Sequence, residues 1–203
     1  KNNKIKKLKK NVKFFNDYKY FPINNSFESR ISKKKFISKS LNKICVFLGG
    51  GNYDNYYLKV AKSIRYLEKK VIFLIGSESS LQIVKKINKL SKNYRVILNS
   101  NKIHIHLFNS DFVIAGGGYT KIEAAYLKTP MVTIPVQKHQ NKLVANFYKY
   151  FRVKYILPNE ISKKKFKNIF RLMNYKNRKK ISIKFSNKFK KNGLKEIIKN
   201  VFK

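Results

Sequence analysis

Short apolar runs alternate with segments of helical periodicity from Lys43 onward, and this alternation restricts the fold more than any other feature. The spacing of Leu81, Val84, Ile87 and Leu90 is typical of such a helix, with one apolar stripe. The apolar runs predict strands at residues 44–48, 71–75, 95–98, 112–115, 131–134 and 154–156. Short, continuously apolar strands separated by helices are typical of a parallel sheet between two helical layers. The sequence therefore predicts an α/β fold with a Rossmann-like parallel sheet flanked by helices.

Two glycine triplets follow predicted strands. Residues 49–51 follow the first strand, residues 116–118 follow the fourth, and a helix-like segment begins after each triplet. The first turn of a helix has unpaired N–H groups and partial positive charge, and glycine lets an anion approach the backbone closely. In such sheets, ligands bind beyond the carboxyl ends of the strands. Two glycine turns at this edge predict a nucleotide-type ligand.

The first glycine loop does not complete a dinucleotide-binding motif. Asp54 stands where G-x-G-x-x-G requires its third glycine, and Glu78 lies too far along the chain to serve as the usual ribose-binding acid. A tight turn followed by an Asn or Asp helix cap explains residues 49–55 equally well. We therefore keep both interpretations of this loop, as a close-approach turn for a ligand and as a structural turn.

The second glycine loop leads into Thr120 and Glu123, for which two interpretations stay open. Their spacing is that of a capping box, in which both side chains serve the helix backbone. Alternatively, the Thr120 hydroxyl and the glycine amides contact a phosphate, and Glu123 accepts hydrogen bonds from two sugar hydroxyls.

The loop at residues 135–140 follows the fifth predicted strand, so it either contacts a bound sugar or caps the next helix as a solvated turn. His139 is the only histidine near the proposed cleft, whereas His104 and His106 lack further ligands in their apolar surroundings. The sequence predicts no metal and no cofactor. No nucleophile–base–orienter triad is visible from spacing, so the catalytic residues stay unknown.

The chain is strongly basic: 48 lysine and arginine residues against nine acidic ones give a formal net charge of +39. The charge is spread along the whole sequence, together with abundant asparagine, isoleucine, phenylalanine and tyrosine. This distribution favours drift in residue usage over recognition of a specific nucleic acid, because spread charge attracts polyanions without reading sequence. Attraction to anionic lipid headgroups stays open.

Composition also divides the chain. Residues 1–42 carry lysine runs and little apolar periodicity, which predicts a linker and the remnant of a missing N-terminal domain. Residues 43–203 form the predicted domain, which ends in basic helices. A break at Asn192-Gly193 precedes a last helix that we expect to dock through Leu194, Ile197, Ile198 and Val201.

No apolar run reaches the roughly 18 residues of a membrane span. The single cysteine, Cys45, lies in an apolar run and is expected to be buried, with no disulfide within the chain. These features predict a cytoplasmic protein, with peripheral contact at the inner face of the membrane as an option. Because the chain begins with Lys1 rather than methionine, we expect a fragment.

The second glycine loop carries a family resemblance. Residues 117–123, Gly-Gly-Tyr-Thr-Lys-Ile-Glu, followed by Leu-Lys-Thr-Pro at 127–130, resemble the G-G-S-T-x-x-E and Leu-Gly-x-Pro motifs of two-domain, GT-B type nucleotide-sugar enzymes. The chain looks like their C-terminal half. It is similar to UDP-sugar hydrolases of the pseudaminic-acid pathway and the related spore-coat polysaccharide proteins, and to family 28 glycosyltransferases.

The resemblance implies a binding role for eight residues. Those implied to bind the nucleotide are Gly50, Gly51, Gly117, Gly118, Thr120 and Glu123. Those implied to bind the sugar are His139 and Gln140. Glu123 would hold the ribose hydroxyls, and the glycine loops would hold the pyrophosphate. The family's catalytic base lies in the N-terminal domain, which is therefore an expected partner in the same or another chain.

The resemblance predicts the UDP-sugar-binding half of a nucleotide-sugar hydrolase that acts at the anomeric carbon in surface-polysaccharide biosynthesis of the nonulosonic acid type. The sequence after Gln140 lacks an Asn-Ala pair that the transferases have, which favours the hydrolase. The alternatives are half of a family 28 hexosyltransferase with a UDP-sugar donor, a basic nucleic-acid-binding module with a Rossmann-like core, and a degenerate nucleotide-binding partner without catalysis.

Overall fold

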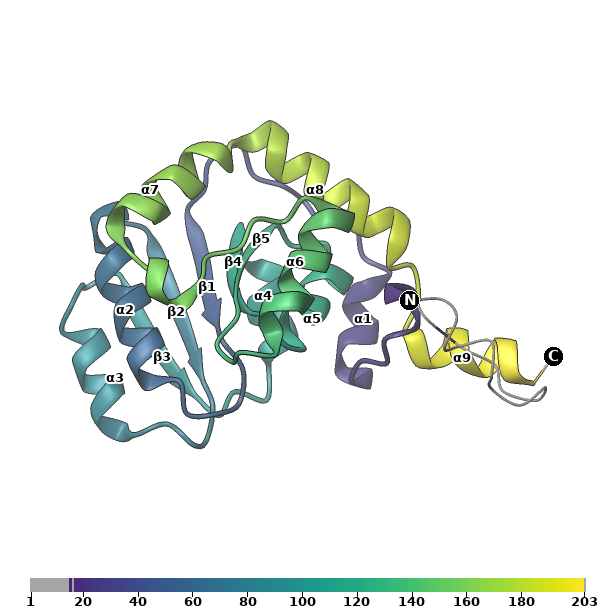
Figure 1. The fold of residues 1–203 in the computed structure, drawn as a ribbon, viewed down its shortest axis with the longest axis horizontal. Coiled ribbons are helices and arrows are strands. Elements are labelled where there is room, and N and C mark those ends of the chain that lie inside the picture. The colour runs from purple at the N-terminus through teal and green to yellow at the C-terminus, as the bar shows by residue number, and fades with distance from the viewer. Residues whose placement is uncertain (1–14, 16, 203) are drawn as a thin grey trace.

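A five-stranded parallel sheet forms the centre of the molecule in the computed structural model, which describes residue 15 and residues 17–202 (Figure 1). Its strand order is β3-β2-β1-β4-β5. The strands are β1 (Lys43–Phe47), β2 (Lys70–Ile75), β3 (Tyr94–Leu98), β4 (Phe112–Gly116) and β5 (Met131–Ile134). The predicted Rossmann-like α/β fold is confirmed.

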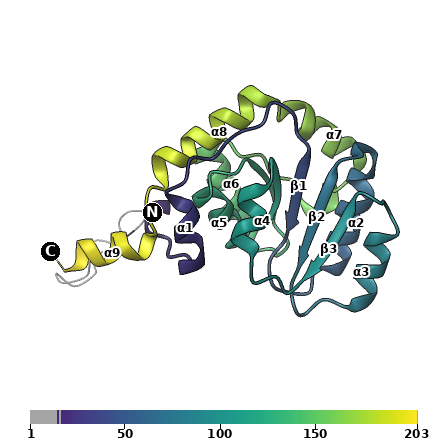
Figure 2. The same cartoon turned by 180° about the vertical axis from the view of Figure 1, so that it is seen from behind.

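Helices cover both faces of this sheet. The α-helices are α1 (Glu28–Ile31), α2 (Asp54–Ile64), α3 (Leu81–Asn88), α4 (Ile103–Asn109), α5 (Thr120–Tyr126), α6 (Gln140–Phe151), α7 (Lys163–Leu172), α8 (Tyr175–Lys188) and α9 (Gly193–Val201). Short 3₁₀ turns lie at Tyr18–Tyr20, Asn25–Phe27, Arg65–Leu67 and Pro158–Glu160. Helices α2 and α3 lie on one face, with α7 against α2, and α4, α5 and α6 lie on the other (Figures 1 and 2).

The strand order places a topological switch point between β1 and β4. The chain runs outward from β1 through β2 to β3, then returns to β4 on the other side of β1 and continues to β5. The connections before and after this return lie on opposite faces of the sheet, so the loops that leave β1 and β4 diverge. Open parallel sheets bind their ligands in the crevice that such loops form.

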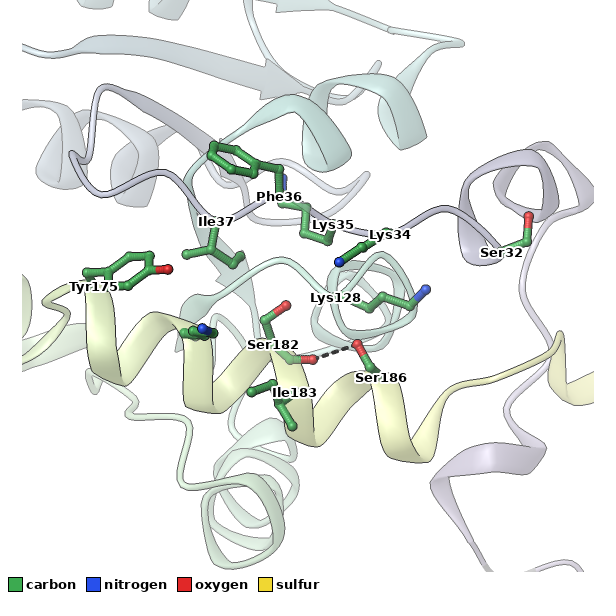
Figure 3. Close-up of a pocket in the computed structure, with 11 residues that line it drawn as sticks. Ser32, Lys34, Lys35, Phe36, Ile37, Lys128, Tyr175, Ser182, Ile183 and Ser186 are labelled. Carbon is green, nitrogen blue, oxygen red and sulfur yellow. Dashed lines mark hydrogen bonds between the residues drawn. The ribbon is translucent and has the colours of Figure 1, made fainter.

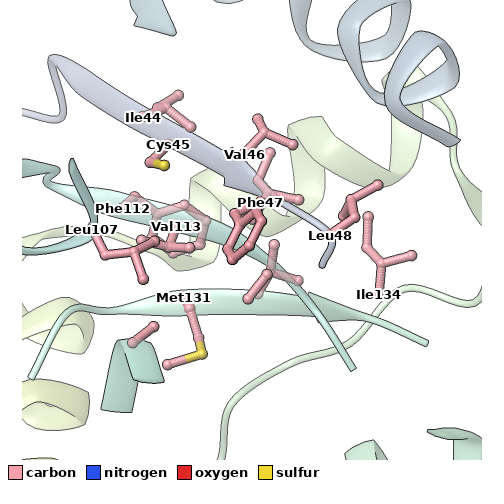
Figure 4. Close-up of a cluster of buried hydrophobic side chains, with 14 of the residues drawn as sticks. Ile44, Cys45, Val46, Phe47, Leu48, Leu107, Phe112, Val113, Met131 and Ile134 are labelled. Atoms are coloured by element: carbon pink, nitrogen blue, oxygen red, sulfur yellow. The ribbon is translucent and has the colours of Figure 1, made fainter. Parts of the chain in front are cut away.

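Continuous apolar side chains hold the central strands in place. Ile44, Cys45 and Val46 of β1 are fully buried, and Ile44 pairs with Phe112 of β4 in the sheet. Side chains of β1, β4, β5 and Leu107 of α4 pack into one cluster (Figure 4). Burial also raises the pKa of the Cys45 thiol, so this cysteine is an unreactive part of the core, as expected from its position.

Two details of the predicted secondary structure are wrong. The predicted strand at residues 154–156 is reduced to an isolated bridge between Thr133 and Tyr155, because this segment pairs with the edge of β5 at only one position. In α3, Leu81 is 71% exposed, and Ile83 and Ile87 are the buried residues. In the first turn of α3, the buried residue is therefore Ile83 and not the predicted Leu81.

The segment before β1 packs on the domain. Ile23, Phe27 and Ile31 are buried in the main core. The Asn192 side chain accepts a hydrogen bond from the backbone N–H of Ile23 and donates one to its carbonyl oxygen, at 3.2 and 2.9 Å. Residues 17–42 are therefore bound to the domain that follows; their origin as a remnant of another domain stays a prediction.

The last helix departs from expectation. Asn192 caps α9 by accepting a hydrogen bond from the N–H of Leu194, in agreement with the predicted break. The apolar residues Leu194, Ile198 and Val201 are all more than 40% exposed, however, and α9 projects from the body of the domain (Figure 1). The predicted docking is therefore only partial: α9 contacts the turn Tyr18–Tyr20 and Ile197 is partly buried, but the other three predicted residues stay exposed. None of the helices in the described part of the chain has the length and hydropathy of a membrane span.

Candidate functional site

The two glycine loops lie side by side at the carboxyl edge of the sheet. A Cβ atom on Gly116 would be 2.1 Å from the backbone oxygen of Leu48, so the end of β4 touches the end of β1. A Cβ atom on Gly76, after β2, would be 2.3 Å from the carbonyl oxygen of Gly50. These contacts require glycine, and they join the ends of three neighbouring strands into one surface.

The three glycines of the first loop differ in what the fold demands of them. Gly49 has a φ of +120°, which L side chains rarely adopt. A Cβ atom on Gly51 would be 3.1 Å from the ring of Tyr53, whereas one on Gly50 would meet nothing within 4 Å. Gly50 is also exposed, so its backbone is open to a ligand without any structural need for glycine.

Lys121 hydrogen-bonds to the backbone of the second glycine turn, a role that was not predicted from the sequence. Its side chain is 4% exposed, and its ammonium donates to the carbonyl oxygens of Gly117 and Gly118 at 2.6 and 2.8 Å. Burial lowers the pKa of Lys121 to about 8. The available signal was a lysine in a helix whose other residues are nearly all buried, which is visible only once the burial of α5 is known.

This lysine fixes the direction of the peptide groups in the turn. In a trans peptide the C=O and the next N–H point in opposite directions. Since the carbonyls of Gly117 and Gly118 face Lys121, the N–H groups of Gly118 and Tyr119 face away from it. Within the described residues, neither of these N–H groups nor that of Thr120 has an acceptor. The turn thus presents consecutive free donors, an arrangement suited to an anion.

Thr120 and Glu123 do not form the capping box that their spacing permits. Tyr119 occupies the N-cap position, without a side-chain cap, and Thr120 is already the first helical residue. No described residue hydrogen-bonds to the Thr120 hydroxyl or to the Glu123 carboxylate. Burial raises the pKa of Glu123 to about 7. The structure therefore places a half-buried carboxyl, without a hydrogen-bond partner among the described residues, beside the glycine turn.

The loop after β5 closes over this turn. Gln140 is buried, and its Oε1 accepts a hydrogen bond from the N–H of Val136 at 3.0 Å. A Cβ atom on Gly118 would be 3.2 Å from Gln140 Nε2, and no described residue accepts a hydrogen bond from that amide nitrogen. His139, next to Gln140, is exposed and is the N-cap residue of α6. Gln140 thus lies against the turn, and His139 lies in solvent beside it.

A second contact missed from the sequence connects the first and third loops. Gln137 Nε2 donates to the hydroxyl of Tyr53, 3.1 Å away. Asp54 starts α2 and accepts hydrogen bonds from the N–H and hydroxyl of Ser80, so it is engaged with the loop after β2. Tyr53 therefore links the loops that flank the second glycine turn.

The remaining two histidines lie in α4. His104 and His106 are in α4, where the ring of Phe27 contacts that of His104 at 5.7 Å between centroids. Within the described residues, no group of three or more His, Cys, Asp and Glu side chains is placed to hold a metal ion. Both histidines therefore belong to the layer of helices on one face of the sheet.

Comparison with protein families identifies the fold. Residues 44–201 match the model of the glycosyltransferase family 28 C-terminal domain. The chain belongs to this family. The match includes both glycine loops, the loop after β5 and the helices up to α9, and it confirms the resemblance to the C-terminal half of GT-B enzymes. A search of curated protein sequences finds no match.

Solved structures agree on the fold of this family 28 domain. The Acinetobacter baumannii MurG structure superposes with a TM-score of 0.65 at 14% identity, covering 87% of this chain and 52% of that chain. The calicheamicin glycosyltransferase CalG4 gives a TM-score of 0.63 at 13% identity, covering 82% of this chain and 43% of that chain. The Neisseria meningitidis UDP-GlcNAc 2-epimerase, solved with UDP-GlcNAc, gives 0.54 at 18% identity, with coverage of 82% and 45%.

The family 28 domain therefore spans about half the length of the structures it matches. The family match supports the transferase alternative of the sequence analysis better than the hydrolase that was placed first. The nucleic-acid-binding module receives no support from these matches.

Proposed function

We propose that this chain is the donor-binding half of a family 28 glycosyltransferase and that it binds a UDP-sugar at the carboxyl ends of β1 and β4. The observation that carries the proposal is the unpaired carboxyl of Glu123 beside the glycine turn. Partial burial of a carboxyl without protein partners costs free energy, and two adjacent hydroxyls of a ribose would supply the missing donors. The raised pKa of Glu123 has this same cause.

The pyrophosphate belongs on the glycine turn. The free N–H groups of Gly118 and Thr120 and the Thr120 hydroxyl supply donors, with Gly117 permitting close packing behind them. Gly50 and Gly51 of the first loop approach from the other side, where Gly50 leaves open space. Lys121 contributes by holding the turn and by placing its charge beneath it.

The sugar belongs near the loop after β5. His139 is exposed there, and the free Nε2 of Gln140 lies against Gly118, so both have donors available for sugar hydroxyls. Transfer breaks the bond between the anomeric carbon and the β-phosphate oxygen, while an acceptor hydroxyl forms the new bond and loses its proton. Backbone donors fixed before the reaction stabilise the charge that develops on the leaving UDP. The base that takes the proton is expected in an N-terminal domain.

Calorimetric titration with UDP and UDP-N-acetylglucosamine tests the proposal. Glu123→Gln should weaken UDP binding by roughly tenfold or more, since charge-assisted hydrogen bonds to the ribose are lost. Glu68→Gln is the matched control, because Glu68 is an exposed acid that precedes β2 at the opposite edge of the sheet. Undetectable UDP binding at millimolar concentration, or equal binding by the Glu123 variant, contradicts the assignment.

The same titration separates the sugar subsite from the nucleotide subsite. His139→Ala should lower the affinity for UDP-N-acetylglucosamine while UDP affinity is retained. A variant that binds both ligands as the wild type does would remove His139 from the sugar subsite.

A further inference from the structure

A lysine-lined cavity lies away from the glycine-loop edge, between α8, the segment before β1 and the turn that precedes β5 (Figure 3). Its volume is about 630 Å³, within the range of small-ligand pockets. Lys128, on its wall, belongs to the turn at the amino end of β5, so the cavity faces the edge of the sheet opposite the proposed nucleotide site. Nothing in the proposed transfer reaction uses this cavity.

The side chains that line the cavity carry positive charge. Four of its eleven lining residues are lysines, namely Lys34, Lys35, Lys128 and Lys179, and none is acidic. The three ion pairs among the described residues include none of the four. The acid that acts on Lys35 is Asp111, whose carboxylate is already bonded to the N–H groups of Asn42 and Lys43.

Two of these lysines are held in fixed positions by backbone carbonyls. The Lys35 ammonium donates to the carbonyl oxygens of Phe108 and Ser110, and the Lys128 ammonium donates to those of Ile31 and Lys33. An ammonium has three donors, so Lys128 keeps one N–H beyond these two bonds, whereas the Lys35 ammonium also lies 5.1 Å from the centroid of the Phe108 ring. Burial lowers the pKa of Lys35 to about 8, and the nearby charge of Asp111 offsets this effect only in part.

The rim of the cavity is apolar. Phe36 is 82% exposed and Ile183 of α8 is 49% exposed, and both line the cavity beside the exposed lysines Lys34 and Lys179. Exposed aromatic and aliphatic groups beside lysines match the interface of an anionic membrane, where phosphate and acyl chain lie close together. A nucleic acid backbone would use the lysines and leave Ile183 without a partner.

We propose that the lysine-lined cavity is a membrane-contact site, which takes the phosphate of an anionic phospholipid headgroup while Phe36 and Ile183 enter the bilayer interface. Lys35 and Lys128 form a fixed cationic floor, and Lys34 and Lys179 close on the headgroup from the exposed side. Charge spread over the whole surface would attract a membrane to any face of the protein. A defined site instead predicts that one face, the one with the cavity, contacts the membrane.

An engineered fluorophore tests the orientation, because the sequence contains no tryptophan. The Phe36→Trp variant should shift its emission to shorter wavelength with vesicles of equal parts phosphatidylglycerol and phosphatidylcholine, and stay unshifted with phosphatidylcholine alone. Leu81→Trp is the control, because Leu81 is 71% exposed on α3, on the far side of the molecule (Figure 1). Equal shifts in both variants, or no shift in the Phe36 variant, overturns the proposal.

Vesicle flotation of two charge-matched double variants tests the lysines. Lys34→Glu with Lys179→Glu should weaken binding to the same anionic vesicles by roughly tenfold or more. Lys62→Glu with Lys85→Glu makes the same change in net charge at exposed positions of α2 and α3 and should lose distinctly less. Equal losses would mean that binding follows net charge alone, which contradicts a defined site.

Soluble ligands test whether a small phosphate compound or a nucleic acid occupies the cavity instead of a lipid headgroup. Glycerol phosphate that saturates the cavity with the affinity of the vesicles would make this a small-molecule site and overturn the membrane assignment. Single-stranded RNA that shifts the emission of the Phe36→Trp variant, when vesicles do not, would overturn it as well. Retained UDP binding in the Lys34 and Lys179 double variant would show that the variant is folded.

Discussion

The ammonium of Lys121 lies 2.6 Å from the carbonyl oxygen of Gly117, so a buried charge supports the turn at the end of β4. The same nitrogen holds the carbonyl of Gly118. Free N–H groups point away from the lysine, toward the space above the turn. The orientation of the proposed phosphate donors therefore depends on a side chain that does not itself face the ligand.

Replacing Lys121 by methionine should weaken UDP binding by roughly tenfold or more, because the turn loses two charge-assisted hydrogen bonds. Methionine keeps the length and apolar stem of lysine, so the core contacts persist. Calorimetric titration with UDP measures the loss. Unchanged affinity would mean that the turn keeps its orientation without the lysine.

Lys121 should also leave a signature in the pH dependence of stability. Its pKa is about 8 in the folded chain, against 10.5 for an ordinary lysine, so the unfolded chain binds more protons between these two values. The free energy of unfolding contributed by this group therefore rises with pH across that window. Urea titrations of wild type and Lys121→Met should diverge there, with the steeper rise in the wild type. Parallel curves would contradict the lowered pKa.

Binding of UDP-N-acetylglucosamine should strengthen as pH rises through about 7, because ribose hydroxyls donate to the ionised form of Glu123. The contribution of Glu123 to the free energy of unfolding changes with pH in the opposite direction to the affinity. The pKa of Glu123 in the folded chain lies above the ordinary value of 4.5, so the stability from this group is full below 4.5 and is lost as pH rises through about 7. Glu123→Gln should flatten the rise in affinity; a rise that persists in this variant would point to another group.

Two glycine substitutions should distinguish the glycine that the fold requires from the glycine that a bound ligand requires. Gly116→Ala should lower the free energy of unfolding by about 3 kcal/mol or more, because its Cβ would lie 2.1 Å from the backbone oxygen of Leu48. Gly50→Ala should leave the melting temperature unchanged, since nothing lies within 4 Å of its Cβ position, and should weaken UDP binding. A stable Gly50 variant with full UDP affinity would exclude close contact between this loop and the ligand.

Arg178 gives a prediction for the segment before β1. Its guanidinium is buried and donates to the carbonyl oxygens of Met173, Ser38 and Lys39. Arg178→Lys should cost about 2 kcal/mol of unfolding free energy, because an ammonium cannot reproduce the planar fork. Lys180→Met, at an exposed position of α8, is the control in urea unfolding. Equal stability of both variants would show that these bonds contribute little.

The fold could be predicted because its signals are local. Continuous apolar runs such as the one around Val46 specify buried parallel strands, and glycine after a strand marks the loops. The segment around Tyr155 was overestimated because its apolar residues pack beside an edge strand, where a single bridge suffices. The exposed face of α9 could not be foreseen, because periodicity shows that a helix has an apolar face without showing what covers it.

The site could be predicted only in part. Thr120 and Glu123 were found because they follow the glycine turn in the chain, but the choice between helix cap and ligand contact required the backbone around Tyr119. Lys121 and the pair Tyr53–Gln137 were missed, since their roles arise from contacts across the fold or with carbonyl groups. Such contacts leave no spacing rule in the sequence.

The crossing of two distant segments at Gly193 has a mechanical consequence. A Cβ atom on Gly193 would be 2.2 Å from the carbonyl oxygen of Phe21, so two stretches of backbone that are far apart in the chain touch directly. The hydroxyl of Tyr126 donates to that same carbonyl oxygen and fixes the crossing to α5. A displacement of either segment would therefore have to move the other, so the segment before β1 and the start of α9 respond to force as one unit.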